Sequence, residues 1–255
     1  MAKGTALITG ASSGIGAELA KVCAGDGYDV VLVARQRAAL DVLALKLSQA
    51  HKITARTLVA DLADPLAARM VFESVGTVDI LINNAGFGLR GAYAEIDWEA
   101  EGRMIQVNIT ALAQLTRLYL PGMIARRSGR ILNVASTAAF VPGPFMAMYY
   151  SSKAFVLSFS LAVANELQGT GVTLTALCPG ATRTNFFATA GTTDTKLMKG
   201  PSMSAAEVAR AGYDAMMAGK AEIIAGARNR WMIWGTRFAP RKMLANITRR
   251  LNSAD

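Results

Sequence analysis

A tyrosine and a lysine four positions apart have the chemistry to move a proton. Tyr149 and Lys153 lie in a stretch of helical character, where residues four apart share a face with their Cβ atoms about 5–6 Å apart. A phenol is a poor base at neutral pH because its ordinary pKa is about 10. A neighbouring ammonium favours the phenolate, so we expect Lys153 to lower the pKa of Tyr149 and make it a proton shuttle. The alternative is an exposed Tyr–Lys pair without a catalytic role.

Two further polar residues extend this constellation. Ser136 ends an apolar run that predicts a strand, and Asn108 lies inside a predicted helix. The carboxyl ends of parallel strands line a ligand crevice, so the Ser136 hydroxyl is placed to polarise a substrate carbonyl. The alternative is that Ser136 only caps the next turn. Asparagine is a poor helix former, so Asn108 needs a reason for its position.

A glycine-rich turn, TGASSGIG at residues 9–16, follows the first predicted strand and opens the first predicted helix. Such a turn lets the backbone approach a pyrophosphate, whose charge is stabilised by the amides and dipole of the helix N-terminus. The alternative is an ordinary tight turn, which also favours glycine. We expect this segment to bind a dinucleotide, through Gly10, Ser12, Ser13, Gly14, Ile15 and Gly16.

The end of the second predicted strand indicates which dinucleotide is bound. Proteins that bind the unphosphorylated form usually have Asp or Glu there, whereas this chain has Ala34 followed by Arg35. A guanidinium pairs well with a 2′-phosphate, so the sequence predicts NADP(H). Arg37 is better interpreted as a solvated charge. Asp61 is a candidate acceptor for the adenine amino group, or else it caps the helix expected near Asp64.

Alternating strands and helices must position these residues. Short apolar runs predict strands at 5–9, 29–34, 53–60, 78–83, 129–136, 171–178 and 222–226. Helical patterns separate them at 14–25, 37–50, 64–75, 97–127, 150–168 and 204–218, with start signals at Asp64-Pro65 and at Ser204 with Glu207. Strands separated by such helices pair in parallel with right-handed crossovers. The sequence therefore predicts an α/β fold, a single doubly wound domain over residues 1–227.

Composition excludes several classes of protein. The chain has 255 residues, of which 52% are hydrophobic and 18% charged, so it is neither disordered nor collagen-like. Its single histidine, His51, excludes zinc sites that need several histidines, and we expect no metal. Cys23 and Cys178 lie far apart, which fits a reducing compartment. Because we find neither a signal peptide nor an apolar run of about 18 residues, we expect a cytoplasmic protein.

Together these motifs resemble the short-chain dehydrogenases/reductases over residues 3 to about 226. The resemblance rests on TGASSGIG, Asn83-Asn84-Ala85-Gly86, Asn108, Ser136, the YYSSK segment at 149–153 and the PGATRT segment at 179–184. It implies a Rossmann-type domain with a seven-stranded parallel sheet flanked by helices. It also implies a homodimer or homotetramer.

The resemblance assigns roles to individual residues. Asn108, Ser136, Tyr149 and Lys153 would form the catalytic tetrad. Lys153 would also hold the nicotinamide ribose, and Asn108 a water that relays protons toward Lys153. Tyr150 competes with Tyr149, but the thirteen-residue interval from Ser136 and the Y-x-x-x-K spacing select Tyr149. Further cofactor contacts would come from Asn84, Ala85, Gly86, Pro179, Gly180, Thr182 and Thr184, and Arg35 is similar to the arginine of NADP-preferring members.

These features predict an NADP(H)-dependent oxidoreductase that interconverts a carbonyl and an alcohol. Tyr149 would donate the proton and Ser136 would stabilise the developing oxyanion. The alternatives are a catalytically idle dinucleotide-binding sensor or scaffold and a 3-oxoacyl thioester reductase. Residues 140–148 and 185–187 are rich in Phe and Met, which indicates an apolar substrate or simply core packing. Residues 185–203 are predicted to form a mobile lid.

The C-terminal extension, residues 228–255, contributes +6 of the net charge of +9. Intervals of three and four predict two amphipathic helices that separate at Ala239-Pro240. Their apolar stripes are Trp231, Trp234 and Phe238, and then Leu244, Ile247 and Leu251. Basic residues beside such stripes suit a helix in a membrane interface. Alternatively, the stripes pack on the body or on a partner subunit. No nucleic-acid motif accompanies the charge, so we expect no nucleic acid partner.

Overall fold

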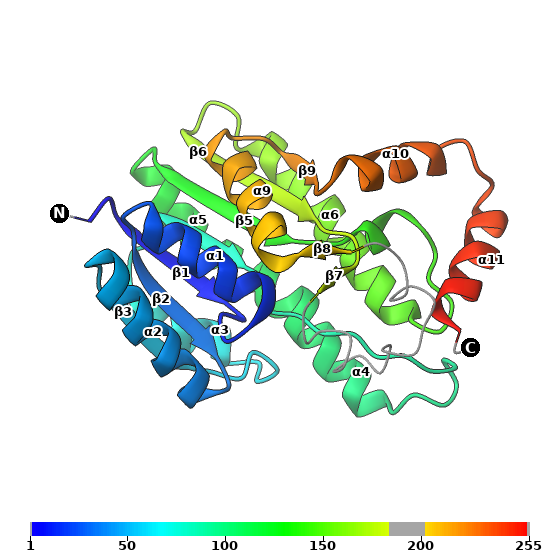
Figure 1. The fold of residues 1–255 in the computed structure, drawn as a ribbon, viewed down its shortest axis with the longest axis horizontal. Helices are drawn as coiled ribbons and strands as arrows, with labels where there is room; N and C mark the ends of the chain where they lie inside the picture. The colour runs from blue at the N-terminus through cyan, green and yellow to red at the C-terminus, as the bar shows by residue number, and fades with distance from the viewer. Residues whose placement is uncertain (1, 184–201, 254–255) are drawn as a thin grey trace.

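A computed structural model describes residues 2–183 and 202–253, and its centre is a seven-stranded parallel sheet (Figure 1). The strand order β3-β2-β1-β4-β5-β6-β9 confirms the predicted doubly wound fold. The strands are β1 (Thr5–Thr9), β2 (Asp29–Ala34), β3 (Ala55–Val59), β4 (Ile80–Asn83), β5 (Gly129–Val134), β6 (Val172–Cys178) and β9 (Glu222–Ile224).

Helices cover both faces of this sheet. One face carries α1 (Gly14–Gly25), α2 (Arg37–His51) and α9 (Ala205–Met217), and the other carries α3 (Ala67–Val75), α5 (Leu112–Ala125) and α6 (Ala147–Glu166). Successive strand residues point to opposite faces, and both Leu7 and Ile8 are fully buried, each in a different core cluster. The strands are apolar on both sides because both sides are covered.

The strand order reverses between β1 and β4. The chain proceeds from β1 outward to β3 and then returns to place β4 on the other side of β1. Ligands of such folds bind where the order reverses, outside the carboxyl ends of the strands. Ile8 pairs with Ile82, so the glycine-rich turn after β1 lies beside the Asn83–Gly86 segment after β4.

The expected helix at 97–127 divides into three parts. They are α4 (Trp98–Ile105), the π-helical segment η1 (Gln106–Ala111) and α5. Asp97 caps α4 by accepting hydrogen bonds from the Glu99 and Ala100 amides. Asn108 lies within the π-helical segment. Such segments occur frequently at functional sites. A functional role would explain why a poor helix former such as Asn108 lies inside a helix.

Two other helices begin away from their predicted starts. The helix expected at Asp64-Pro65 begins only at Ala67, because Asp64 Oδ1 accepts a hydrogen bond from the Leu66 amide (2.8 Å) and forms a turn first. The helix expected from residue 150 begins at Ala147, which places Tyr149 inside its first turn. The predicted capping box of Ser204 and Glu207 at the start of α9 is confirmed.

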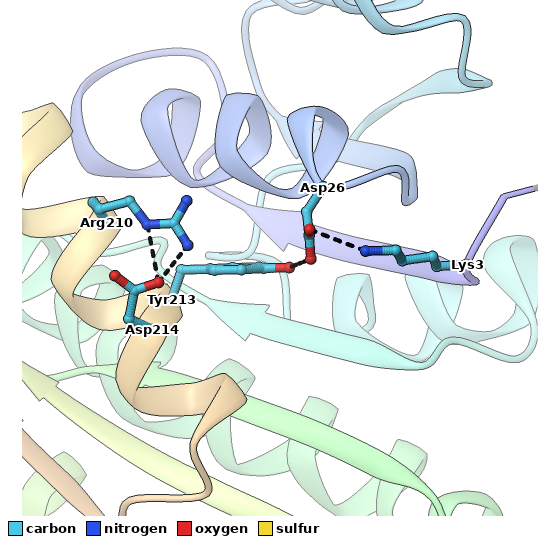
Figure 2. A network of polar contacts seen from close by, with 5 residues as sticks. All are labelled: Lys3, Asp26, Arg210, Tyr213 and Asp214. Carbon is cyan, nitrogen blue, oxygen red and sulfur yellow. Dashed lines mark hydrogen bonds and ion pairs between the residues drawn. The ribbon is translucent and has the colours of Figure 1, made fainter.

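A polar network fastens α9 to the first half of the fold (Figure 2). Tyr213 donates a hydrogen bond to Asp26, which follows α1, and Lys3 forms an ion pair with the same carboxylate at 3.0 Å. Arg210 and Asp214 form a second ion pair on the same helix. The hydrogen bonds from Tyr213 and then Lys3 lower the pKa of Asp26. This network links elements that are almost two hundred positions apart in sequence.

The C-terminal extension forms two helices, α10 (Ala227–Thr236) and α11 (Arg241–Asn252), which confirms the break predicted at Ala239-Pro240. Both lie at the edge of the molecule, beyond β9 and the start of α6 (Figure 1). The strands β7 (Thr182–Arg183) and β8 (Met203–Ser204) form a short parallel pair, and β8 leads directly into α9. Within residues 2–183 and 202–253, no helix combines the length and apolarity that crossing a membrane requires.

Candidate active site

A cleft of about 550 Å³ opens at the carboxyl ends of the strands, where the strand order reverses. The structure brings sixteen of the predicted site residues to its wall. They are Gly10, Ser12, Ser13, Gly14, Ile15, Arg35, Asp61, Asn84, Ala85, Gly86, Ser136, Tyr149, Lys153, Pro179, Gly180 and Thr182. Gly16 and Asn108 lie behind this wall. Thr184 and most of the predicted lid fall outside the described residues.

The glycine-rich turn packs tightly against the segment after β4. Gly10 has a positive φ of 65°, and a Cβ there would lie 2.8 Å from Asn84 Nδ2. A Cβ on Gly16 would lie 2.3 Å from the Gly10 carbonyl oxygen, so neither position accommodates a side chain. Asn84 closes the contact by donating hydrogen bonds to the carbonyls of Thr9 (3.0 Å) and Gly10 (3.2 Å).

The first turn of α1 borders the cleft and contains no acidic residue. Among the described residues, the Ser13 side chain makes no capping hydrogen bond at this helix terminus. The first amides of a helix lack partners within the helix and carry a partial positive charge. The close backbone packing and these amides together fit the pyrophosphate of a dinucleotide.

Two cations border the cleft near the ends of β2 and β3. Arg35 is exposed and lines the cleft, whereas Arg37 begins α2 and is not part of the wall. Arg103, at the end of α4, also lines the cleft and donates to Asp61 Oδ2 at 2.9 Å. Sequence reasoning missed Arg103, because its partner is 42 positions away and no local motif marks it.

Asp61 does not cap α3, so that alternative is wrong, and its contact with the adenine amino group stays a prediction. Its Oδ1 accepts a hydrogen bond from the Ala63 amide (3.0 Å), so it stabilises a turn before α3 and does not cap the helix itself. It also lines the cleft. Partial burial acts to raise the pKa of Asp61, but the bonds from Ala63 and Arg103 outweigh it and the net pKa is lowered. The carboxylate is therefore charged and held in place at neutral pH.

Tyr149, Ser136 and Lys153 meet at one side of the cleft. Tyr149 is hydrogen-bonded to Ser136, and the Lys153 ammonium lies 5.9 Å from the centre of the Tyr149 ring. Lys153 Nζ donates to the Val134 carbonyl at 2.8 Å. Both Tyr149 and Lys153 are buried, which excludes the alternative of an exposed surface pair.

The pKa values in this cluster differ from our expectation. Burial raises the pKa of Tyr149, while the hydrogen bond with Ser136 acts in the opposite direction. Burial also lowers the pKa of Lys153 to about 8. The pKa of Tyr149 is thus raised where we expected it to be lowered, because desolvation dominates and the Lys153 ammonium is bonded to Val134 O. Tyr149 is a neutral phenol at neutral pH, which is the form that donates a proton.

Ser136 caps the next turn, which was the alternative to a role in binding substrate. Its Oγ accepts a hydrogen bond from the Ala138 amide (3.1 Å) and so caps the short helix η2 (Thr137–Phe140). The same hydroxyl is hydrogen-bonded with Tyr149, donates to the Pro179 carbonyl at 3.5 Å and lines the cleft. These bonds hold the oxygen at the wall of the cleft, and the role of Ser136 toward a substrate carbonyl stays a prediction.

Asn108 lies directly behind Gly86. Its amide nitrogen donates to Phe87 O (2.9 Å) and Ser152 Oγ (3.1 Å), and its oxygen accepts from the Phe87 amide (3.1 Å). A Cβ on Gly86 would lie 3.1 Å from Asn108 Oδ1 and 3.4 Å from Lys153 Nζ. Asn108 therefore positions the Gly86–Phe87 backbone beside Lys153.

Tyr150 has a different partner from Tyr149. Its hydroxyl donates to Asn252 Oδ1 in α11 (3.2 Å), and Asn252 Nδ2 donates to the Pro144 carbonyl (3.0 Å). The two tyrosines therefore differ in their hydrogen-bond partners: Tyr149 is bonded to Ser136, and Tyr150 is bonded to Asn252 of the C-terminal helix. Asn252 escaped sequence reasoning because its partners are more than 100 positions away.

We expect Asn252→Ala to lower the free energy of unfolding by about 1–3 kcal/mol, because it leaves the Tyr150 hydroxyl and the Pro144 carbonyl without their partner. Thermal unfolding measures the loss. Asn246→Ala is the matched control, since Asn246 is an exposed asparagine of the same helix. Equal unfolding temperatures for the two variants would show that Asn252 does not hold α11 in place.

Comparison with known proteins establishes the family. The family model of short chain dehydrogenases matches residues 4–195, well over half of the chain. The chain belongs to the short-chain dehydrogenase family. The chain is 39% identical over 176 residues to a very-long-chain 3-oxoacyl-CoA reductase of Phaeosphaeria nodorum, and the match covers 66% of this chain and 51% of the reductase. The chain thus matches about half the length of that curated relative.

Two solved structures resemble the chain over nearly its whole length. A short-chain dehydrogenase from Sphingobium yanoikuyae in complex with NADPH is 34% identical, has a TM-score of 0.83, and the match covers 92% of this chain and 93% of that one. The bulky-bulky ketone specific alcohol dehydrogenase from Comamonas testosteroni is 31% identical, with a TM-score of 0.80 and 93% of each chain covered. The chain therefore has the family's α/β fold.

Proposed function

We propose that this protein is an NADP(H)-dependent reductase of bulky, apolar carbonyl compounds. The observation that carries this proposal is the buried, neutral Tyr149 phenol, which is bonded to Ser136 beside Lys153 in the cleft. A sensor or scaffold needs a dinucleotide site but gains nothing from a proton donor at its edge. The proton-donating cluster therefore favours an enzyme over the idle alternative.

The cleft residues fit the cofactor in three places. The Gly10–Gly16 turn and the α1 terminus would hold the pyrophosphate, Lys153 the nicotinamide ribose, and Arg35 the 2′-phosphate. When bound, NADPH supplies the hydride that reduces the carbonyl carbon. The Sphingobium yanoikuyae enzyme, with NADPH bound, supports this choice of cofactor.

The side chains of the cleft manage charge and protons in the reaction. Tyr149 donates its phenolic proton to the carbonyl oxygen, and the Ser136 hydroxyl donates a hydrogen bond to that oxygen as negative charge develops. The Lys153 ammonium stabilises the resulting phenolate. Asn108 keeps the Gly86–Phe87 backbone at its place beside Lys153.

An apolar wall supports the proposed substrate class. Phe87, Met146 and Tyr150 line the cleft and also belong to one packed apolar cluster. Met146 therefore contributes both to core packing and to the apolar wall of the cleft. The similar enzyme from Comamonas testosteroni is described as specific for bulky-bulky ketones. A 3-oxoacyl thioester is the second candidate, because the Phaeosphaeria nodorum relative is a 3-oxoacyl-CoA reductase.

An activity screen tests the proposal. The rate at which the wild-type protein oxidises NADPH is measured with bulky apolar ketones, short aldehydes, sugars and 3-oxoacyl-CoA thioesters. We expect turnover with the bulky ketones and none with the sugars. Turnover confined to the thioesters would favour the second candidate. NADPH binding without turnover of any compound would support the sensor and refute the reductase.

The pH profile provides an independent prediction. Burial lowers the pKa of Lys153 to about 8, so its ammonium is present below pH 8 and is lost above it. We expect kcat/KM for ketone reduction to be level up to about pH 7, to fall to about half at pH 8, and then to fall by up to about tenfold per pH unit. In Lys153→Arg, the guanidinium stays charged, so the residual activity should lose this limb. An unchanged limb in the variant would assign it to another group.

We also propose a homodimer or homotetramer, as the family resemblance implies. The outer faces of the two long helices support it, since Ile124 of α5 and Phe155 and Leu161 of α6 are exposed apolar side chains. Light scattering of the purified protein measures the assembly size.

A further inference from the structure

The α11 helix docks on the body through its polar side chains. Thr248 donates to the Pro142 carbonyl, and Asn252 donates to the Pro144 carbonyl; both side chains are buried. The Arg249 guanidinium lies 4.8 Å from the centre of the Phe145 ring. The side of α11 that faces the protein is therefore the polar one.

Most large apolar side chains of both C-terminal helices are exposed, although Ile233 of α10 is buried. Trp231, Trp234 and Phe238 are 72%, 53% and 73% exposed. Their rings contact one another edge-on, with centroids 6.0 and 5.0 Å apart, and form an aromatic row. Met232 of α10 and Met243, Ile247 and Leu251 of α11 are also exposed. We call these seven side chains the aromatic-apolar face. So many large exposed apolar side chains on two short helices mark an interaction site.

Positive charge surrounds the aromatic-apolar face. Residues 228–251 contain seven basic residues and no acid, and all seven are exposed. Among the described residues, none of the seven forms an ion pair with a carboxylate. The seven are Arg228, Arg230, Arg237, Arg241, Lys242, Arg249 and Arg250. The occupant of this surface must therefore offer both apolar surface and negative charge.

A second copy of the chain fits these requirements poorly. A symmetric dimer uses the same patch on both subunits, so pairing through this face would bring two sets of seven cations together. An anionic bilayer surface provides apolar acyl chains and negative headgroups at the same place. Aromatic rings such as those of Trp231 and Trp234 are enriched at this interface.

We propose that α10 and α11 bind the surface of an anionic lipid bilayer, with the aromatic-apolar face in the acyl boundary and the surrounding cations at the headgroups. The helices lie in the interface plane and do not cross it, as amphipathic interfacial helices do. Because the inner side of α11 holds Tyr150 and the Pro142–Phe145 segment, the bilayer lies next to the wall of the cleft. This inference rests on the C-terminal extension alone and is independent of the proposed reaction.

Vesicle flotation of the full-length protein tests the proposal. The vesicles consist of phosphatidylcholine alone or of equal parts of phosphatidylcholine and phosphatidylglycerol. We expect flotation with the anionic vesicles only, and its loss at high salt as the charges are screened. The combined variant Trp231→Ser, Trp234→Ser, Phe238→Ser should lose about tenfold or more of the vesicle-bound fraction.

Trp98→Ser is the matched control, because Trp98 is 65% exposed and belongs to α4 and not to the C-terminal extension. It should float like the wild type, and circular dichroism and NADPH binding confirm that both variants are folded. Absence of wild-type flotation with anionic vesicles overturns the proposal. So does an equal loss in Trp98→Ser. If the wild type does not float and the triple variant breaks a homo-oligomer, the face is a protein interface instead.

Discussion

Tyr149→Phe should reduce kcat for ketone reduction by about 10²–10⁴-fold, which is the usual contribution of a positioned proton donor. Phenylalanine keeps the buried ring and removes only the oxygen that bonds with Ser136. The fold and the affinity for NADPH should therefore change little. Steady-state turnover with NADPH, together with NADPH binding followed by its fluorescence, separates the chemical step from binding.

Tyr150→Phe is the matched control, because it removes a hydroxyl from the neighbouring tyrosine, which is bonded to Asn252 instead. We expect this variant to keep most of the wild-type kcat while its unfolding temperature falls. A larger loss of kcat in Tyr150→Phe than in Tyr149→Phe would reverse the assignment of the proton donor.

Arg35→Ala should weaken NADPH binding by roughly 1.5–3 kcal/mol, or about ten- to 150-fold in Kd, and leave NADH binding almost unchanged. The reason is that a guanidinium forms charge-assisted hydrogen bonds with a 2′-phosphate, which NADH lacks. Titration calorimetry with both cofactors measures the two affinities.

The nearby Arg37→Ala controls for a general loss of positive charge, since Arg37 is exposed at the start of α2 but does not line the cleft. Equal effects of Arg35→Ala on NADPH and NADH would remove the phosphate role from Arg35. A wild-type preference for NADH would remove the whole cofactor assignment.

The order of strands and helices could be predicted from sequence because buried parallel strands are apolar on both faces. The runs around Ile8 and Leu32 needed no tertiary information. A helix start was harder to predict where a side chain forms a competing turn, as Asp64 does with the Leu66 amide. Ser204 and Glu207 form a complete capping box, and there the predicted start holds.

The candidate site was predictable where its residues lie in local motifs. Spacing selected Tyr149 over Tyr150, but the physical difference between them lies in the distant partners Ser136 and Asn252. Arg103 reaches the cleft from a helix without any such motif. The direction of the Tyr149 pKa shift was wrong because burial, which sequence does not reveal, outweighs the charge of Lys153.

The C-terminal extension shows the same limit. Its periodicity predicted two helices and the break between them, but not which side faces the body. Thr248 and Asn252 decide this by bonding to the carbonyls of Pro142 and Pro144. The apolar stripe is consequently left outward, contrary to the usual orientation of a surface helix.

Isotope transfer tests the central claim most directly. NADPH that carries deuterium on one or the other face at its transferable position is incubated with the wild-type protein and a bulky apolar ketone, and mass spectrometry examines the alcohol. We expect one of the two labelled cofactors to place a single deuterium on the carbinol carbon, and we expect Tyr149→Phe to slow formation of the labelled alcohol by about 10²–10⁴-fold. An alcohol free of label with both cofactors, or no alcohol at all across the ketone panel, would contradict a carbonyl reductase.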